Sequence, residues 1–187
     1  MHDYLRSKTG VLGLLLLGAL IFCALFAPWI APQNPYDLAQ LDVLDGRLAP
    51  GSFSTDGHSK YWLGTDAQGR DMFSAILYGL RTSLAVGLAA TVGAVALGLL
   101  TGILAGYFGG RMDAFIMRIA DIQLSFPSIL IALVLLAVLG QGIDKIIYAL
   151  IAAQWAYYAR TVRSTALTER NKEYIDGAVT QGLRTPR

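Results

Sequence analysis

The pattern of apolar and polar positions divides the chain into long uncharged windows separated by charged segments. Four such windows occur, at residues 9–36, 82–110, 122–143 and 146–159. A helix needs about 20 apolar residues to cross the hydrocarbon core of a bilayer, and the first three windows reach that length. The fourth is shorter, but Lys145 and Arg160 at its ends have long side chains that can extend to the head groups. The pattern therefore predicts four membrane spans, at about residues 10–31, 82–107, 115–140 and 144–162.

The first window is also similar to a cleaved signal peptide, because Arg6 and Lys8 precede its apolar run. The run from Val11 to Ala27 is longer than the usual apolar region of such a peptide, which has about 7–15 residues. An uncleaved anchor is therefore the better interpretation, with residues 1–35 forming a cytoplasmic end and the first span.

Positive charge predicts which ends of the spans face the cytoplasm, because cytoplasmic loops of membrane proteins carry an excess of Lys and Arg. Basic residues precede span one, separate spans two and three, and follow span four: Arg6, Lys8, Arg111, Arg160, Arg163, Arg170, Lys172, Arg184 and Arg187. If these lie inside, residues 36–80 form an extracytoplasmic segment. Both termini of this multi-pass protein are then cytoplasmic.

Composition supports a membrane protein and excludes several other classes. Apolar residues make up 55% and charged residues 15% of the chain, whereas soluble domains carry about a quarter charged residues. A formal net charge of +2 is too small for a nucleic-acid-binding domain. Cys23, His2 and His58 are too few and too far apart for a metal cluster, and we expect no cofactor. Because the spans contain no clustered carboxylates or nucleophile–base pair, we do not expect an enzyme.

Small residues recur at every fourth position of span two, at Ala90, Ala94, Gly98, Gly102 and Gly106. This spacing keeps them on one helical face and lets the backbone of another helix approach closely. The pattern predicts a tightly packed helix, either as ordinary membrane-helix packing or near a subunit interface.

Span three contains an acidic residue, Asp121, and a proline, Pro127. Proline removes an amide donor and clashes with the preceding turn, so we expect a kink near Phe126. Arg118 lies three residues before Asp121 and can pair with it on one face. The segment is either an interfacial ion pair with a packing kink or a bent helix bordering a translocation path. Gln154 in span four is a further intramembrane polar group, which a simple interhelical hydrogen bond also explains.

The extracytoplasmic segment ends in a run of Asp, Gly and Arg that predicts a capped turn followed by a helix. From Asp71 onward, apolar residues at helical spacing predict a short helix lying on the membrane: Met72, Phe73, Ile76, Leu77 and Leu80.

The stretch after span four is cationic, and we expect it to be partly helical, interrupted at Gly177 and ended near Gly182. Tyr174, Ile175 and Ala178 form an apolar strip within it. The stretch is either a solvated tail or a segment that docks in the groove of another protein.

Three stretches together resemble the membrane permeases of binding-protein-dependent ABC importers, in the dipeptide, oligopeptide and nickel group. The first precedes span two and supplies the motif positions Gly64, Thr65, Asp66, Gly69, Arg70 and Asp71; the second runs from Asp121 to Pro127. The third resembles the cytoplasmic EAA loop, which docks on an ATPase subunit: Glu173, Tyr174, Ile175, Asp176, Gly177, Ala178 and Gly182. Asp176-Gly177-Ala178 stands where the family usually has Glu-Ala-Ala, and Gln181 where it usually has Leu.

The resemblance implies an all-α bundle of the type I importer kind, with four of an expected six spans present. Residues 81–187 would form a partial permease domain with the EAA-type loop at about 163–187, apparently truncated at the C-terminal side. The implied function is part of a translocation path for peptides or a similar small solute in the bacterial inner membrane. The implied partners are a second permease subunit, two ABC ATPase subunits that hydrolyse ATP, and an extracytoplasmic substrate-binding protein. A four-span membrane scaffold or assembly protein without transport activity remains the alternative.

Overall fold

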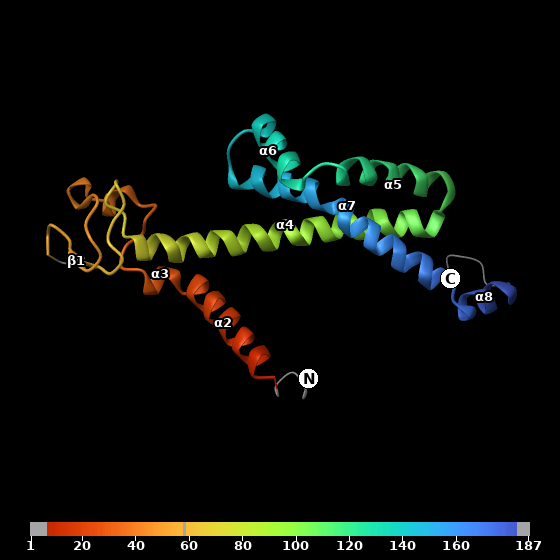
Figure 1. Cartoon of the computed structure of the whole chain (residues 1–187), viewed down its shortest axis with the longest axis horizontal. Helices are drawn as coiled ribbons and strands as arrows, with labels where there is room; N and C mark the ends of the chain where they lie inside the picture. The colour runs from red at the N-terminus through yellow and green to blue at the C-terminus, as the bar shows by residue number, and fades with distance from the viewer. Residues whose placement is uncertain (1–6, 58, 183–187) are drawn as a thin grey trace. The chain divides into compact units, whose positions relative to one another are not determined.

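The computed structural model describes residues 7–57 and 59–182, without the side chains of Asp176, Ala178 and Val179. The basic residues Arg6, Arg184 and Arg187 and the two histidines used in the sequence argument lie outside the described residues. The chain is mostly helical and divides into two compact units, Met1–Ala85 and Val86–Arg187. Figure 1 shows the order of the elements, and each unit is described by itself below.

The first unit contains the helices α2 (Lys8–Leu25) and α3 (Ala27–Ile30), followed by short elements and the start of α4 (Met72–Phe108). The short elements are two 3₁₀ turns, η1 (Leu38–Gln40) and η2 (Val43–Asp45), and the strands β1 (Ser52–Phe53) and β2 (Lys60–Tyr61). The two strands form an antiparallel hairpin in which Ser52 lies opposite Tyr61. The second unit contains the rest of α4 and the helices α5 (Gly110–Leu124), α6 (Ser128–Leu139), α7 (Ile143–Arg170) and α8 (Glu173–Thr180).

Among the described residues, two helices are long and apolar enough to cross a membrane, namely α2 and α4. A third crossing is present if the bent pair α5 and α6 counts as one span. Helix α7 is long enough but is not apolar enough to meet the same measure. The predicted all-α membrane class agrees with the structure, but length and hydropathy give two or three spans in place of the four expected.

The short surface helix expected after Asp71 is wrong, because these residues form the first turns of the 37-residue helix α4. At about 1.5 Å per residue, α4 is longer than a bilayer core is thick. Gly79 lies inside the helix and costs only about 1 kcal/mol relative to Ala, which neighbouring turns offset. The Thr82 hydroxyl donates to the Tyr78 carbonyl at 3.1 Å, so its hydrogen-bonding need is met within the helix. Nothing in the local sequence therefore stops the helix before the span begins.

The second unit buries small side chains and exposes large ones. Its most buried positions are mainly alanines: Ala90, Ala94, Ala105, Ala120, Ala149, Ala153, Ala156 and Ala159. Leucine and valine side chains lie mostly on the outside, as on the exposed faces of α4 and α6. Helices in lipid gain little by hiding apolar side chains from one another, so they associate where small residues let their backbones approach. The distribution is therefore typical of a membrane-embedded bundle.

Helix α7 packs along α4 through the small-residue stripe predicted from the sequence. A Cβ built on Gly98 would meet the Tyr158 Cβ at 2.4 Å, and one on Gly102 would meet the Ala159 carbonyl oxygen at 2.6 Å. Further along, a Cβ on Gly106 would meet the Ala166 Cβ at 2.7 Å. The contacts advance along both helices together, so α4 and α7 run parallel (Figure 1).

The kink expected near Phe126 is a complete helix break. Helix α5 ends at Leu124, α6 begins at Ser128, and their axes are bent by 92°. The amide of Ser125 donates to the Asp121 carbonyl, while Pro127 has no amide proton to continue the helix. The carbonyl of Pro127 accepts from the Leu130 amide at 2.9 Å, so the proline opens α6 at the position where a missing donor costs least.

The α4–α7 packing predicts the effect of adding one methyl group. We expect Gly102→Ala to lower the stability of the folded protein by about 1–3 kcal/mol, because the methyl group would strike the α7 backbone. Gly87→Ala is the matched control, since among the described residues nothing lies within 4 Å of a Cβ at that position. Thermal unfolding of the detergent-purified protein measures the stability of both variants relative to the unchanged protein. An equal loss for both, or none for Gly102→Ala, would contradict the packing.

Candidate functional site

The residues that resemble the EAA loop form a short helix directly after α7. Helix α7 ends at Arg170, Asn171 and Lys172 make a turn, and α8 covers Glu173–Thr180. The interruption expected at Gly177 is wrong, because α8 runs through that residue. The helical structure is interrupted instead at Asn171 and Lys172, directly before α8. A single glycine costs about 1 kcal/mol in a helix, which the remaining turns of α8 tolerate.

Glu169 holds the turn between α7 and α8 together. Its carboxylate accepts from the Lys172 ammonium at 2.6 Å and from the Tyr174 hydroxyl at 3.0 Å. Because these two donors stabilise the charged form, with Lys172 the stronger, the pKa of Glu169 lies below its ordinary value. Tyr174 nevertheless remains 62% exposed. The start of α8 therefore presents an aromatic ring on a turn of defined geometry.

Other loop residues predicted from the sequence lie around this ring. Glu173 is exposed, Ile175 is half-buried, and a Cβ on Gly177 would meet nothing within 4 Å among the described residues. Gly182 follows the helix with φ +79°, a left-handed conformation that favours glycine. The side chains of Asp176 and Ala178 lie outside the described residues, so the contacts of the expected apolar strip are described only for Tyr174 and Ile175.

Two ion pairs that the sequence analysis missed fasten α5 to α7. The Arg163 guanidinium donates from Nε and Nη2 to the two carboxylate oxygens of Asp113, the second bond being 2.6 Å long. Arg160 donates from Nη2 to Asp121. The pairing expected between Arg118 and Asp121 is therefore wrong, because the antiparallel approach of α7 offers Asp121 an arginine on a different helix. The signal available in the sequence was the opposite charges at facing ends of spans three and four.

A glutamine clamp joins the same two helices further from the charged end. The Gln123 amide donates to the Ala152 carbonyl at 2.6 Å, and its oxygen accepts from the Trp155 indole at 2.8 Å. Gln154, which the sequence singled out, is exposed and makes no such interhelical bond within the described part of the chain. The neighbour in sequence, Trp155, carries that role instead. Asp121, Gln123 and the break before Pro127 thus lie on one short segment, which α7 holds by the Arg160 and Trp155 side chains and the Ala152 carbonyl.

The motif before α4 builds the attachment of the first unit to that helix. Asp71 is fully buried and accepts through Oδ2 from the amide and hydroxyl of Ser74, at 2.9 and 2.6 Å. Gln33 closes a ring, because its side-chain oxygen accepts from the Asp71 backbone amide at 2.7 Å and its backbone amide donates to the Ser74 hydroxyl. This is the N-terminal cap of α4, so the predicted capped turn agrees with the structure. The second carboxylate oxygen of Asp71 is buried without a hydrogen-bond partner among the described residues.

The other motif positions before α4 shape the turn. Gly64 and Gly69 both have φ +77°, and a Cβ on Gly69 would strike the Asp42 carbonyl at 2.0 Å. The Thr65 hydroxyl donates to the Asp45 carbonyl, and Asp66 accepts from the Gln68 and Arg70 amides at 2.7 and 3.0 Å. The Arg70 Nε is buried and unpaired within the described ranges. The functional groups of Thr65 and Asp66 are thus used inside the fold.

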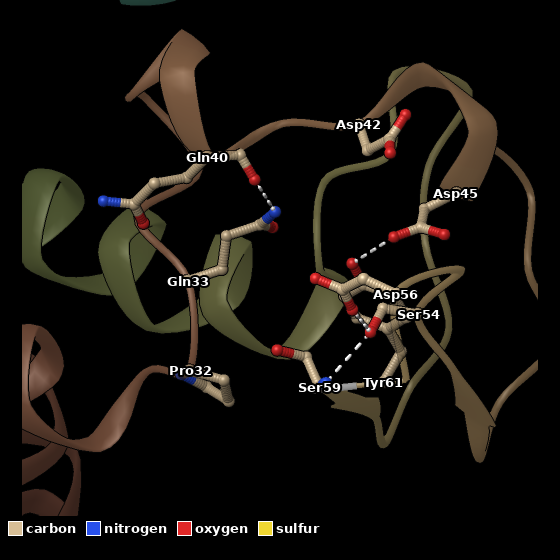
Figure 2. A pocket seen from close by; sticks show the side chains of 9 residues that line it. All are labelled: Pro32, Gln33, Gln40, Asp42, Asp45, Ser54, Asp56, Ser59 and Tyr61. Atoms are coloured by element: carbon tan, nitrogen blue, oxygen red, sulfur yellow. Dashed lines mark hydrogen bonds between the residues drawn. The ribbon is translucent and has the colours of Figure 1, made fainter.

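A polar cavity of about 230 Å³ lies beside this turn and is shown in Figure 2. Asp42, Asp45 and Asp56 contribute to its wall, but no group of metal-ligating side chains occurs among the described residues. Asp45 is 3% exposed, and its carboxylate accepts from the amide and hydroxyl of Thr55 and from the Tyr61 hydroxyl at 2.8 Å. Burial acts to raise the pKa of Asp45, but these hydrogen bonds hold that pKa below its ordinary value. Burial and the bond to Asp45 raise the pKa of Tyr61.

Two family models match this chain. Residues 98–187 match the model described as binding-protein-dependent transport system inner membrane component. Residues 1–50 match the N-terminal TM domain of oligopeptide transport permease C. The chain belongs to this family of ABC importer permeases. Helices α7 and α8 both fall inside the longer match.

Individual relatives of this permease cover nearly the whole chain. It is 36% identical over 186 residues to the di/tripeptide transport system permease protein of Pseudomonas aeruginosa. This alignment covers 100% of the present chain and 60% of the relative. Identity is 40% over 181 residues to the dipeptide transport system permease protein of Escherichia coli, covering 97% and 59%. For the nickel transport system permease protein of Escherichia coli it is 35% over 176 residues, covering 94% and 60%. The chain thus spans about 60% of the length of these relatives.

The names of these relatives describe components of transport systems, and none describes a scaffold. The alternative interpretation from the sequence therefore gains no support. The family is one of inner-membrane components, which agrees with a multi-pass protein whose apolar helices form two or three candidate spans.

The Asp45–Tyr61 pair predicts how the permease's first unit responds to acid. The lowered pKa of Asp45 means that its contribution to stability is present above the ordinary carboxyl pKa, about 4, and is lost as pH falls through the lower folded value. We expect the amides around Thr55 to lose hydrogen-exchange protection as the pH falls below about 4, after correction for the intrinsic exchange rate. Helix α7 in the same samples is the internal control. Protection around Thr55 that falls no earlier than that of α7 as the pH is lowered would contradict the role of the carboxylate.

Proposed function

We propose that this protein is a permease subunit of an ABC importer and forms part of a translocation path for peptides or a similar small solute. Helix α8 is its docking element for an ATPase subunit. The observation that carries the proposal is the exposed Tyr174 ring on a short helix held to the end of α7 by Glu169. A short helix fixed to a long one can transmit a push, and an exposed aromatic ring is a typical anchor for a partner's pocket.

The end of α7 is fixed to the bundle as well as to α8. Arg170 donates to the Tyr107 carbonyl at the end of α4, at 3.3 Å, and Arg163 pairs with Asp113 at the start of α5. A displacement of α8 by a nucleotide-driven ATPase would therefore reach α4 and α5 through α7. ATP hydrolysis belongs to the partner subunits in this proposal, and the spans alternate between outward and inward access.

Four crossings are the span count that fits this mechanism. Helices α4 and α7 run parallel and in close contact, so the chain between them must return across the same depth. The bent pair α5 and α6 supplies that return. Helix α7, although weak in hydropathy, is then the fourth span, and its close packing on α4 supports this assignment. Family members are expected to add two further spans.

Charge supports an orientation with the α7–α8 turn in the cytoplasm. Arg111, Arg163, Arg170 and Lys172 all lie where α4 ends, α5 starts and α7 ends. The positive-inside rule places that side in the cytoplasm, together with both termini. Residues 36–80 then face the outside, where an extracytoplasmic binding protein would deliver solute to this chain and a second permease subunit.

The docking proposal predicts a specific loss for Tyr174→Ala. We expect this variant to reduce uptake and solute-stimulated ATP hydrolysis by about tenfold, the effect of about 1.4 kcal/mol at an interface anchor. Tyr148→Ala, which removes a similarly exposed ring at the other end of α7, should leave both activities near normal. Tyr174→Phe keeps the ring and loses only the bond to Glu169, so it should retain most activity. Normal uptake by Tyr174→Ala at normal membrane levels would refute the docking role.

The orientation is tested by thiol labelling in a Cys23→Ser background. A cysteine at Ala67, an exposed position before α4, should react with an impermeant maleimide added outside intact cells. A cysteine at Thr168, exposed near the end of α7, should react only after the cells are opened. The reverse pattern would overturn the proposed topology.

A further inference from the structure

Helix α7 has a second face, beside the one that Ile151, Tyr158 and Val162 turn towards α4, and this face is polar. Gln154, Tyr157, Thr161 and Thr165 follow one another at spacings of three and four residues and are all exposed. Residues at these spacings lie above one another on a helix, so they form one continuous stripe. The stripe has no large aliphatic side chain, unlike the exposed faces of the neighbouring helices.

Packing fixes the depth of this stripe along α4. A Cβ on Gly93 would meet the Ile151 side chain at 2.4 Å, and one on Gly98 would meet the Tyr158 Cβ at the same distance. Gln154 and Tyr157 lie between these two contacts. The uncharged window of α4 runs from residue 82 to residue 110, so the contacts fall near its middle. If α4 spans the bilayer, Gln154 and Tyr157 therefore lie deep within the membrane layer.

Other exposed side chains at this depth have the character expected of a lipid-facing or dry surface. On α4, Val92 is 60% exposed and Leu99 is 46% exposed. On α6, the exposed side chains are likewise aliphatic, including Val134 and Val138. On α4, Thr91 is exposed as well, but it stands among aliphatic side chains, whereas the polar residues of α7 follow one another along one face.

The Asp121–Arg160 pair extends the polar surface. Arg160 lies three residues after Tyr157, and the side chains of Arg160 and Asp121 are 57% and 54% exposed. Charged groups inside a membrane usually face a bundle interior or a water-filled cavity, because facing lipid costs several kcal/mol. An ion pair that remains half exposed on the single chain therefore needs water or another protein beside it.

The stripe contains groups that differ in how well lipid would tolerate them. The Thr161 and Thr165 hydroxyls donate to carbonyls four residues earlier, at 3.0 and 3.2 Å, and so need no outside partner. The Gln154 amide has no hydrogen-bond partner among the described residues. It can donate twice and accept twice, and leaving it unpaired in hydrocarbon costs several kcal/mol. Gln154 is therefore the side chain that most requires a hydrated surface.

We propose that this polar face of α7, from Gln154 through Tyr157 to the Asp121–Arg160 pair, is the chain's wall of the hydrated solute path. This inference rests on the proposed permease function and adds to it which face of which helix meets the solute. The wall offers amide and phenol hydrogen bonds at mid-depth and one charge of each sign beyond them. Such a surface suits a small hydrophilic solute that carries both donors and acceptors, as a short peptide does.

The test measures water at each position by the rate of thiol modification. Single cysteines replace Gln154, Tyr157, Val92 or Leu99 in the Cys23→Ser protein, within the complex assembled in membranes with its partner subunits. The probe is the anionic reagent 2-sulfonatoethyl methanethiosulfonate. Val92→Cys and Leu99→Cys are depth-matched controls, because they flank the same α4 contacts. Only the hydrated thiolate reacts, and apolar surroundings raise the pKa of a thiol, so we expect modification at least about tenfold faster at 154 and 157 than at the controls.

Two results would overturn the proposal. Modification at Gln154→Cys and Tyr157→Cys as slow as at the controls would mean that the face is dry. Slow modification with efficient disulfide formation between position 154 and a cysteine in the second permease subunit would assign the face to a subunit interface. Uptake is measured in the same membranes. A complex that fails to transport peptides but keeps the contrast in labelling would count against the proposed solute and leave the hydrated face in place.

Discussion

The second unit depends on the close approach of the α4 and α7 backbones. Gly98 and Gly102 bring atoms of α7 to where a side chain on α4 would otherwise stand. In a bilayer the apolar effect that drives soluble folding is weak between helices, so dispersion contacts over a close interface supply much of the association. The same interface keeps α7 beside α4, although α7 alone is too polar to qualify as a span. Packing, and not partitioning into lipid, therefore places the least apolar of the long helices.

Helix α5 is attached to α7 by a different kind of contact. Two arginines of α7 pair with two aspartates of α5, and Gln123 adds a pair of hydrogen bonds. The Arg163–Asp113 pair is the more enclosed of the two, with side chains 31% and 18% exposed, so removing one of its members leaves the other partly buried without a counter-charge. Small residues thus fix α4, charged and amide groups fix α5, and the Glu169 turn fixes α8. These three attachments meet on α7, which explains why it is the helix through which a displacement of α8 would spread.

Sequence reasoning located the helices well but was less able to pair them. The uncharged windows predicted where α2, α4, α6 and α7 lie, since charge is excluded from hydrocarbon whatever the partner helix is. The capped turn at Asp71 was also predictable, because its chemistry is local. Arg118 was assigned to Asp121 on local spacing, whereas the partner, Arg160, comes from a helix almost forty residues away. The continuity of α4 and the passage of α8 through Gly177 were missed because a lone glycine weakens a helix without ending it.

The motif residues before α4 illustrate how a family signature can be structural. Asp66 and Thr65 use their side chains on nearby backbone groups, and Gly69 leaves room for the Asp42 carbonyl. Asp71 uses one carboxylate oxygen to cap α4 and keeps the other buried. Groups occupied in this way serve the turn and the cap, and the second carboxylate oxygen of Asp71 is buried away from any solute. The exposed amide of Gln154 and the half-exposed pair Asp121–Arg160 do have that capacity. The chemistry that meets a solute is therefore expected on α7, away from the residues that identify the family most clearly.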